Sequence, residues 1–181
     1  MDNSRSLTNR MIRAAKLEVD LYEEVEADKT ANGQAFQAVT IASISSGLGY
    51  AIWGLISNDG ERFFWGLVLG LVFSILGWLA WSIMTYWVGT TFFKTPATSA
   101  TVGELMRTIG FSNSPRVLAF FAFIPILGAV IAFVVSVWAL VAGVIAVRQA
   151  LDFSTWRAIG TCIVGWLIYM ILMSIVGIIV S

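Results

Sequence analysis

The side chains that could carry chemistry are few, and a group of carboxylates near the N-terminus stands out. Glu23, Glu24, Glu26 and Asp28 fall within six residues of one another. Oxygen ligands of this kind suit a hard cation such as Ca²⁺. Their spacing matches no EF-hand loop, however. We therefore interpret them as the solvated face of a helix and expect no metal site.

Histidine is absent from the chain, which removes the commonest general base and the commonest metal ligand together. Serine is abundant, but no base is available to activate it. The single cysteine, Cys162, lies in an apolar segment, where we expect it to act as a small buried hydrophobe. These observations predict a protein that is not an enzyme and binds no cofactor.

The composition is that of an integral membrane protein. Of the 181 residues, 58% are hydrophobic and 12% are charged, whereas soluble domains carry about 25% charged residues. Twelve of the 22 charges lie in the first 29 residues. We interpret residues 1–33 as an N-terminal cytoplasmic segment of one or two amphipathic surface helices, and residues 34–181 as the transmembrane domain.

The apolar runs predict an all-α fold with five transmembrane helices, at about residues 34–57, 63–87, 112–127, 129–150 and 156–180. The third helix is expected to be short. The uncharged stretch between Arg116 and Arg148 is too long for one crossing of about 30 Å and slightly too short for two. Pro125 and Gly128 interrupt it. We expect a tight hairpin of the third and fourth helices, in which the third either spans or is re-entrant.

The distribution of Lys and Arg favours five helices over four, because these residues accumulate in short cytoplasmic loops. With five spans and a cytoplasmic N-terminus, ten of the eleven lie inside and Arg62 alone lies outside. With four spans, Arg148 and Arg157 move outside and the ratio falls to eight against three. We therefore expect a multi-pass protein of the cell's inner (plasma) membrane, with its C-terminus outside.

A charged group is expected at the cytoplasmic ends of the helices. It either locks the soluble segments onto the helix ends or forms a docking surface for a partner or for anionic lipid. The candidate contact residues are Arg10, Arg13, Lys16, Arg107, Arg116, Arg148, Asp152 and Arg157.

Small residues at helical spacing predict close helix packing within the membrane. The candidates are Gly47, Gly66, Gly70, Ser74, Ser136 and Gly143. Hydroxyls such as those of Ser43 and Ser46 leave open a polar groove instead. Between the second and third spans, Thr101 and Glu104 have the spacing of a capping box, and Gly110 is expected to end the short helix that they start.

The order of several short motifs resembles the Yip (Ypt/Rab-interacting protein) domain family, most closely its prokaryotic branch. The motifs are Tyr22 to Asp28, Gly33 to Ala35, Gly103 to Arg107, Gly110, Pro115, Ile124 to Gly128, Trp138, Ala146 to Asp152, and Arg157 with Ala158. The resemblance implies five spans and a cytosolic N-terminus. The eukaryotic members of the family bind Rab GTPases and each other and act in vesicle traffic.

One departure limits what the resemblance carries over. Asp20-Leu21-Tyr22 is similar to a cytosolic motif of the eukaryotic branch, but Glu23 and Glu24 stand where Gly-Pro should follow. GTPase binding is therefore not inferred. We expect a non-enzymatic scaffold or adaptor that organises membrane or membrane-protein partners, itself a homo-oligomer or bound to other membrane proteins, with no nucleic-acid partner. The alternative is a passive transporter, channel or lipid-translocating protein with a groove lined by hydroxyls and small residues.

Overall fold

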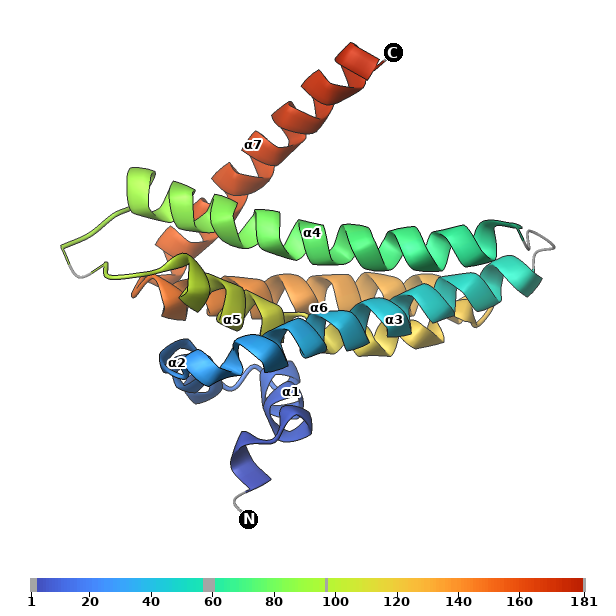
Figure 1. Ribbon diagram of the computed structural model, residues 1–181, viewed down its shortest axis with the longest axis horizontal. Helices are drawn as coiled ribbons and strands as arrows, with labels where there is room; N and C mark the ends of the chain where they lie inside the picture. The colour runs from blue at the N-terminus through green and yellow to red at the C-terminus, as the bar shows by residue number, and fades with distance from the viewer. Residues whose placement is uncertain (1–2, 57–60, 97, 181) are drawn as a thin grey trace.

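The computed structural model describes residues 3–56, 61–96 and 98–180, with side chains for 4–56, 67–96, 98–171 and 174. Every regular element in these ranges is a helix. Among the described residues, three helices are long and apolar enough to cross a membrane: α3 (Asn32–Ile56), α4 (Glu61–Phe92, in its part Leu67–Phe92) and α6 (Leu127–Ala150). They lie side by side along the long axis of the molecule (Figure 1).

The last helix, α7 (Thr155–Val180), carries one charged residue, Arg157, and is otherwise mostly apolar. Its stretch with described side chains, Thr155–Ile171, is shorter than a full membrane span. The first part of α7 packs on α4, where Gly160 approaches the ring of Phe93 and Gly165 faces Trp81. Its second part leaves the bundle at a steep angle (Figure 1). The bundle face beside α7 is therefore not fully covered.

The predicted third span is a 3-10 helix, η3 (Ser114–Phe123). Pro115 has no N–H for a helix bond, and the Ser114 hydroxyl donates to the Phe111 carbonyl at 2.6 Å instead. The preceding α-helix, α5 (Val102–Ser112), therefore stops just before the proline. At about 2 Å per residue, η3 is about 20 Å long, so alone it does not cross about 30 Å of hydrocarbon.

A tight turn after η3 reverses the chain. Ile126 has a positive φ of 66°, and the N–H of Gly128 donates to the Ile124 carbonyl at 2.7 Å. A Cβ on Gly128 would lie 2.0 Å from the carbonyl oxygen of Ala122, so only glycine fits there. The Pro125–Gly128 interruption thus forms the predicted hairpin turn, with η3 as its short arm and α6 as its long arm.

The chain direction alternates through the bundle. Gly49 of α3 lies against the carbonyls of Ala119 and Phe120 in η3, and Gly110 of α5 lies against Ala35 near the start of α3. The α5–η3 segment therefore runs parallel to α3. Helices α4 and α6 run antiparallel to it, and α7 starts at the end where they finish (Figure 1).

Helix α5 differs from the prediction at its C-terminal end. The capping box is confirmed, since the Thr101 hydroxyl and the Glu104 carboxylate each accept a backbone N–H of the other residue. The expectation that Gly110 ends the helix was wrong. Gly110 is helical, and a Cβ there would meet the Cβ of Ala35 at 2.8 Å. The missing side chain allows close helix packing.

The N-terminal segment forms two short helices, α1 (Leu7–Ala15) and α2 (Val19–Ala27), followed by a 3-10 turn, η2 (Lys29–Ala31). The Ser6 hydroxyl caps α1 by accepting from the N–H of Asn9. Leu17, with φ 62°, turns the chain between α1 and α2. Leu21, Tyr22 and Val25 bury one face of α2 completely. Helices α2 and α5 lie at one end of the bundle, and α1 lies against the flank of the bundle next to them (Figure 1). This region is hereafter the capped end.

Candidate functional site

A buried arginine ties the N-terminal segment together at the capped end. Arg10 of α1 is 1% exposed. Its guanidinium binds the Glu24 carboxylate at 2.9 Å, the Asp28 carboxylate at 2.7 Å and the Gln34 side chain at 2.8 Å. Hydrogen bonds from Thr30 and from Arg10 lower the pKa of Asp28 to about 2. The sequence-predicted contact residue Arg10 is therefore fully engaged within the protein.

Arg13 extends the same network. It forms ion pairs with Glu18 at 3.1 Å and with Glu24 at 2.6 Å. The hydrogen bond to Glu24 is the main reason why the pKa of Arg13 is raised. Burial of Glu24 opposes ionisation, but the bonds from Arg13 and Arg10 outweigh it and lower the pKa of that carboxyl. Two of the four carboxylates noted in the sequence, Glu24 and Asp28, thus form ion pairs with arginines.

A second buried arginine joins α5 to α2. Arg107, 4% exposed, donates from Nε to the Val25 carbonyl at 2.8 Å and from Nη1 to the Asn32 side chain at 3.2 Å. Its Nη2 donates to the Glu26 carbonyl. These carbonyls belong to the last turn of α2, where no helical N–H reaches them. Arg107 therefore fixes the end of α2 on the membrane bundle.

Helix α6 donates two further hydrogen bonds to the N-terminal helices. The Trp138 indole donates to the carbonyl of Ala15, the last residue of α1, at 2.7 Å. The Gln149 amide donates to the Glu23 carboxylate at 2.8 Å, and Arg148 donates to the Gln149 side chain. Residues more than 120 positions apart in the chain thus meet at the capped end.

The remaining candidates at this end are exposed. Lys16, Asp152 and Arg157 are all solvent-accessible, and Arg157 donates to the Phe93 carbonyl at 3.4 Å. Burial, reinforced by the negative charges of Asp152 and Glu104, raises the pKa of Glu26 to about 7. The capped end therefore has an interior of hydrogen-bonded side chains and a surface with exposed charged side chains of both signs.

The predicted packing residues are placed in different surroundings. Gly47 of α3 approaches the Leu67 side chain of α4, at 2.9 Å from where a Cβ would lie. A Cβ added at Gly70 would meet no other part of the protein within 4 Å. Ser74, Ser136 and Gly143 line a cavity. Gly66 falls outside the residues with described side chains.

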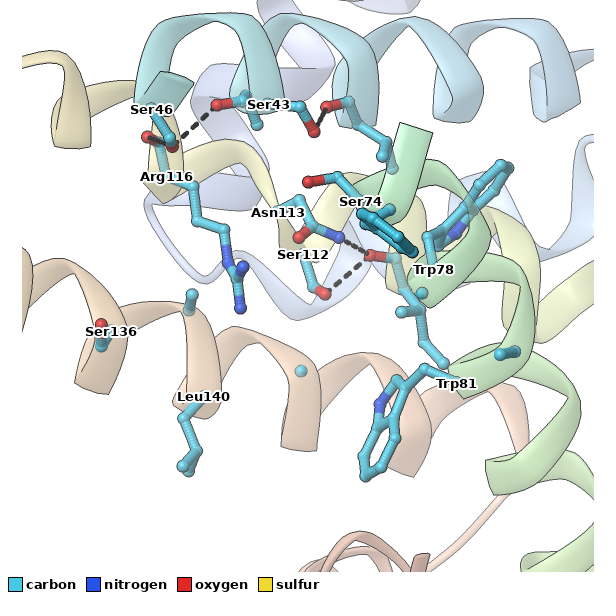
Figure 2. A pocket seen from close by; sticks show the side chains of 18 of the residues that line it. Ser43, Ser46, Ser74, Trp78, Trp81, Ser112, Asn113, Arg116, Ser136 and Leu140 are labelled. Atoms are coloured by element: carbon cyan, nitrogen blue, oxygen red, sulfur yellow. Dashed lines mark hydrogen bonds between the residues drawn. The ribbon is translucent and has the colours of Figure 1, made fainter. Parts of the chain in front are cut away.

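That cavity is a groove of about 1340 Å³ between α3, α4 and α6, bounded at one side by α7. Its polar side chains gather around the α5–η3 junction, and aromatic and aliphatic side chains form the rest of its wall (Figure 2). The hydroxyls largely bond to their own helices. Those of Ser43, Ser46 and Ser136 donate to the carbonyl four residues earlier, at 2.7–2.8 Å. Their oxygens remain able to accept hydrogen bonds.

Arg116 is the one charged side chain among the described residues lining the groove. The Ser46 hydroxyl lies 3.1 Å from its backbone carbonyl. Ser46 is the fifteenth residue of α3, so Arg116 lies about 21 Å along that helix from its start. The side chain crosses the groove from η3 towards α6 (Figure 2). Arg116 is therefore set apart from the other predicted contact residues by its place in the groove.

A comparison of the sequence with known protein families identifies the family of this chain. The model of the Yip1 domain matches residues 21–177. The chain belongs to the Yip1 domain family. No curated protein and no solved structure matches it. The matched part of this Yip1 domain begins within α2, so it includes the carboxylates that hold Arg10 as well as all the membrane helices.

Sequence reasoning missed that Arg116 lines the groove of this Yip1 domain. The residue precedes an uncharged stretch and so resembles a boundary residue. The available signal was Pro115, which ends α5 and starts η3 within the bundle. In the described part of the chain, no group of three His, Cys, Asp or Glu side chains comes together in a way that could hold a metal ion.

Proposed function

We propose that this Yip1-domain protein is a non-enzymatic, five-span scaffold that organises membrane proteins or lipid at a cytoplasmic surface, the capped end. The carrying observation is the bonding of α1 and α2 to α5, α3 and α6 through Arg10, Arg107 and Trp138. A segment held this way presents a surface of fixed shape, which lowers the entropic cost of binding a partner.

The proposed topology counts η3 with α6 as a hairpin and α7 as the fifth crossing. It places the protein in the cell's inner (plasma) membrane. Helices α1 and α2 and the N-terminus lie on the cytoplasmic side, and the C-terminus lies outside. The charge distribution supports this orientation, because the capped end holds nearly all the Lys and Arg residues. Cysteines placed at Lys16 and at Ile126, which is 94% exposed at the opposite end, test it by labelling from the two sides.

The scaffold role is tested by photo-crosslinking in cells. A photoreactive residue at Asp20 or Arg157, both exposed at the capped end, should capture the same protein, and one at Ile126 should not. The charge reversal Arg157→Glu should reduce capture at Asp20 while the protein stays folded and inserted. Capture that is equal at all three positions, or unaffected by the reversal, would argue against a defined docking surface.

The groove favours a second candidate, passive transport or lipid translocation. Most of its polar side chains are concentrated near the α5–η3 junction, whereas a conducting path needs a continuous line of polar groups towards both faces. The test is reconstitution in liposomes, with solute leakage and lipid flipping measured together. Gly70→Trp adds bulk where the groove is open. Activity above empty vesicles that this variant abolishes would favour translocation over the scaffold.

A further inference from the structure

We propose that the groove between α3, α4 and α6 binds one anionic phospholipid, whose phosphate pairs with Arg116 and whose acyl chains lie along the apolar wall. This inference concerns a binding site inside the membrane domain. It does not depend on the scaffold role of the capped end, and it is measured as equilibrium binding rather than transport.

The first argument is charge. The Arg116 guanidinium makes no hydrogen bond or salt bridge with another described residue, and no other described lining residue is charged. A cation within the hydrocarbon region is unfavourable unless an anion or water compensates it. Arg offers two parallel N–H donors that match the geometry of a phosphate. An anion at this position therefore removes the cost of the uncompensated charge.

The second argument is the hydrogen-bonding character of the groove. The hydroxyl protons of Ser43, Ser46 and Ser136 are directed at helix carbonyls, which leaves their oxygens as acceptors. Asn113 uses one amide proton on the Ile109 carbonyl at 2.8 Å. Such acceptors suit headgroup hydroxyls, while Arg116 repels a headgroup ammonium. These groups favour a glycerol headgroup over choline.

The third argument is size and access. The cavity of about 1340 Å³ exceeds the roughly 300–1,000 Å³ of ordinary small-molecule sites. Phe73 and Leu140 on its rim are 66% and 67% exposed, towards the surface that faces lipid. The divergence of α7 leaves this side accessible (Figure 1). A free phosphate ion would leave most of the apolar wall uncovered, whereas acyl chains cover it.

The fourth argument separates a lipid from a second copy of the chain. All eleven Asp and Glu residues fall at positions 2–28, 59–61, 104 and 152. No acidic residue occurs in residues 62–103, 105–151 or 153–181. The apolar helices of a second copy could fill the groove, but they bring no side-chain carboxylate to Arg116. A phospholipid supplies both the apolar surface and the charge.

The experiment uses the full chain in nanodiscs of phosphatidylcholine that contain a small fraction of photoactivatable phosphatidylglycerol. Crosslinked peptides are identified by mass spectrometry, and unlabelled phosphatidylglycerol, phosphatidylcholine or inorganic phosphate is added as competitor. Variants are Arg116→Gln, Arg116→Lys and, as a control at an exposed cation outside the proposed contact residues, Lys29→Gln. Leu140→Trp narrows the groove without touching the charge. Helicity and thermal melting check the fold.

We expect crosslinks on α4 and α6 beside the groove, displaced by phosphatidylglycerol but not by phosphatidylcholine or phosphate. Arg116→Gln should reduce the preference for phosphatidylglycerol about 10-fold, as loss of a charge-assisted hydrogen bond predicts. Arg116→Lys should retain part of this preference, Lys29→Gln should retain all of it, and Leu140→Trp should reduce crosslinking. Equal competition by both lipids, displacement by phosphate alone, or an absence of lipid crosslinks beside the groove would overturn the proposal. If Arg116→Gln does not fold, unchanged crosslinking in Leu140→Trp would overturn it instead.

Discussion

The Nε of Arg107 in α5 donates to the backbone carbonyl of Val25 in α2 at 2.8 Å, across 82 residues of sequence. A membrane-domain side chain thus completes the C-terminal end of a helix in the N-terminal segment. The two parts of the chain share one hydrophobic core, which includes Leu21 and Val25 of α2 together with Leu105 of α5 and Ala146 of α6. The N-terminal helices are therefore part of the folded domain and not an appended arm.

Replacing Arg107 should release α2 from the bundle. Arg107→Ala leaves the carbonyls of Val25 and Glu26 without their donor, at a cost of about 1–3 kcal/mol for each unsatisfied buried group. We expect faster hydrogen exchange and proteolysis in α2, with little change in α6. Lys16→Ala, which removes an exposed cation of the same segment, is the control. Protection of α2 that is unchanged in Arg107→Ala would contradict the role assigned here.

Replacing Arg10 should destabilise the same segment through electrostatics. Arg10→Met keeps the apolar stem but leaves Glu24 and Asp28 without their buried partner, which should lower the free energy of unfolding by about 3 kcal/mol. Arg5→Met, at an exposed position of the same segment, should change it little. Both are compared by thermal melting in detergent.

The ion pair also predicts a dependence on acid. The folded-state pKa of Asp28 is about 2, below its usual 3.8. A lowered carboxyl pKa stabilises the fold above the unfolded-state value and loses this effect as the pH falls through the folded-state value. The stability difference between wild type and Arg10→Met should therefore shrink between about pH 4 and pH 2. A difference that stays constant over this range would show that Asp28 is not a major partner.

Glu26 should make the protein less stable at alkaline pH. Its pKa is about 7 instead of 4.5, because of burial and the nearby carboxylates of Asp152, Glu104 and Glu23, partly offset by Arg107. A raised carboxyl pKa contributes stability below pH 4.5 that is lost as the pH rises through 7. Glu26→Gln should therefore be more stable than wild type at pH 8, by about 2 kcal/mol or less after solvent screening.

At pH 5 the melting temperatures of Glu26→Gln and wild type should be close. Asp20→Asn, on the exposed side of the same helix, serves as the control and should show no such pH-dependent gain. A Glu26→Gln variant that is equally stable to wild type at both pH values would indicate that the Glu26 carboxyl remains well solvated.

The packing of η3 on α3 should depend on one glycine. A Cβ at Gly49 would lie 2.5 Å from the Phe120 carbonyl oxygen and 2.6 Å from that of Ala119. Backbone atoms cannot rotate away, so Gly49→Ala should force the two elements apart and cost about 1–3 kcal/mol. Gly77→Ala, where nothing lies within 4 Å, is the matched control. Equal melting temperatures for the two variants would place η3 away from α3.

Local sequence patterns indicated the elements of this protein well. Hydropathy predicted an all-helical membrane protein, and the spacing of Thr101 and Glu104 predicted the capping box that starts α5. Pro125 and Gly128 predicted the reversal between η3 and α6. Each of these signals lies within a few residues, because helix capping, proline sterics and the transfer of an apolar segment into lipid depend on local chemistry.

Only the tertiary structure decided the roles of the arginines. As sequence, Arg10, Arg107, Arg116 and Arg157 are equivalent cations near the ends of apolar runs. In the fold, Arg10 is buried and binds carboxylates, and Arg107 is buried and binds backbone carbonyls. Arg157 is exposed at the capped end, and Arg116 lines the groove. Gly110 likewise packs against Ala35 instead of ending its helix. These outcomes depend on which residues meet across 14 to 82 positions of chain, and hence on how the helices pack rather than on composition or spacing.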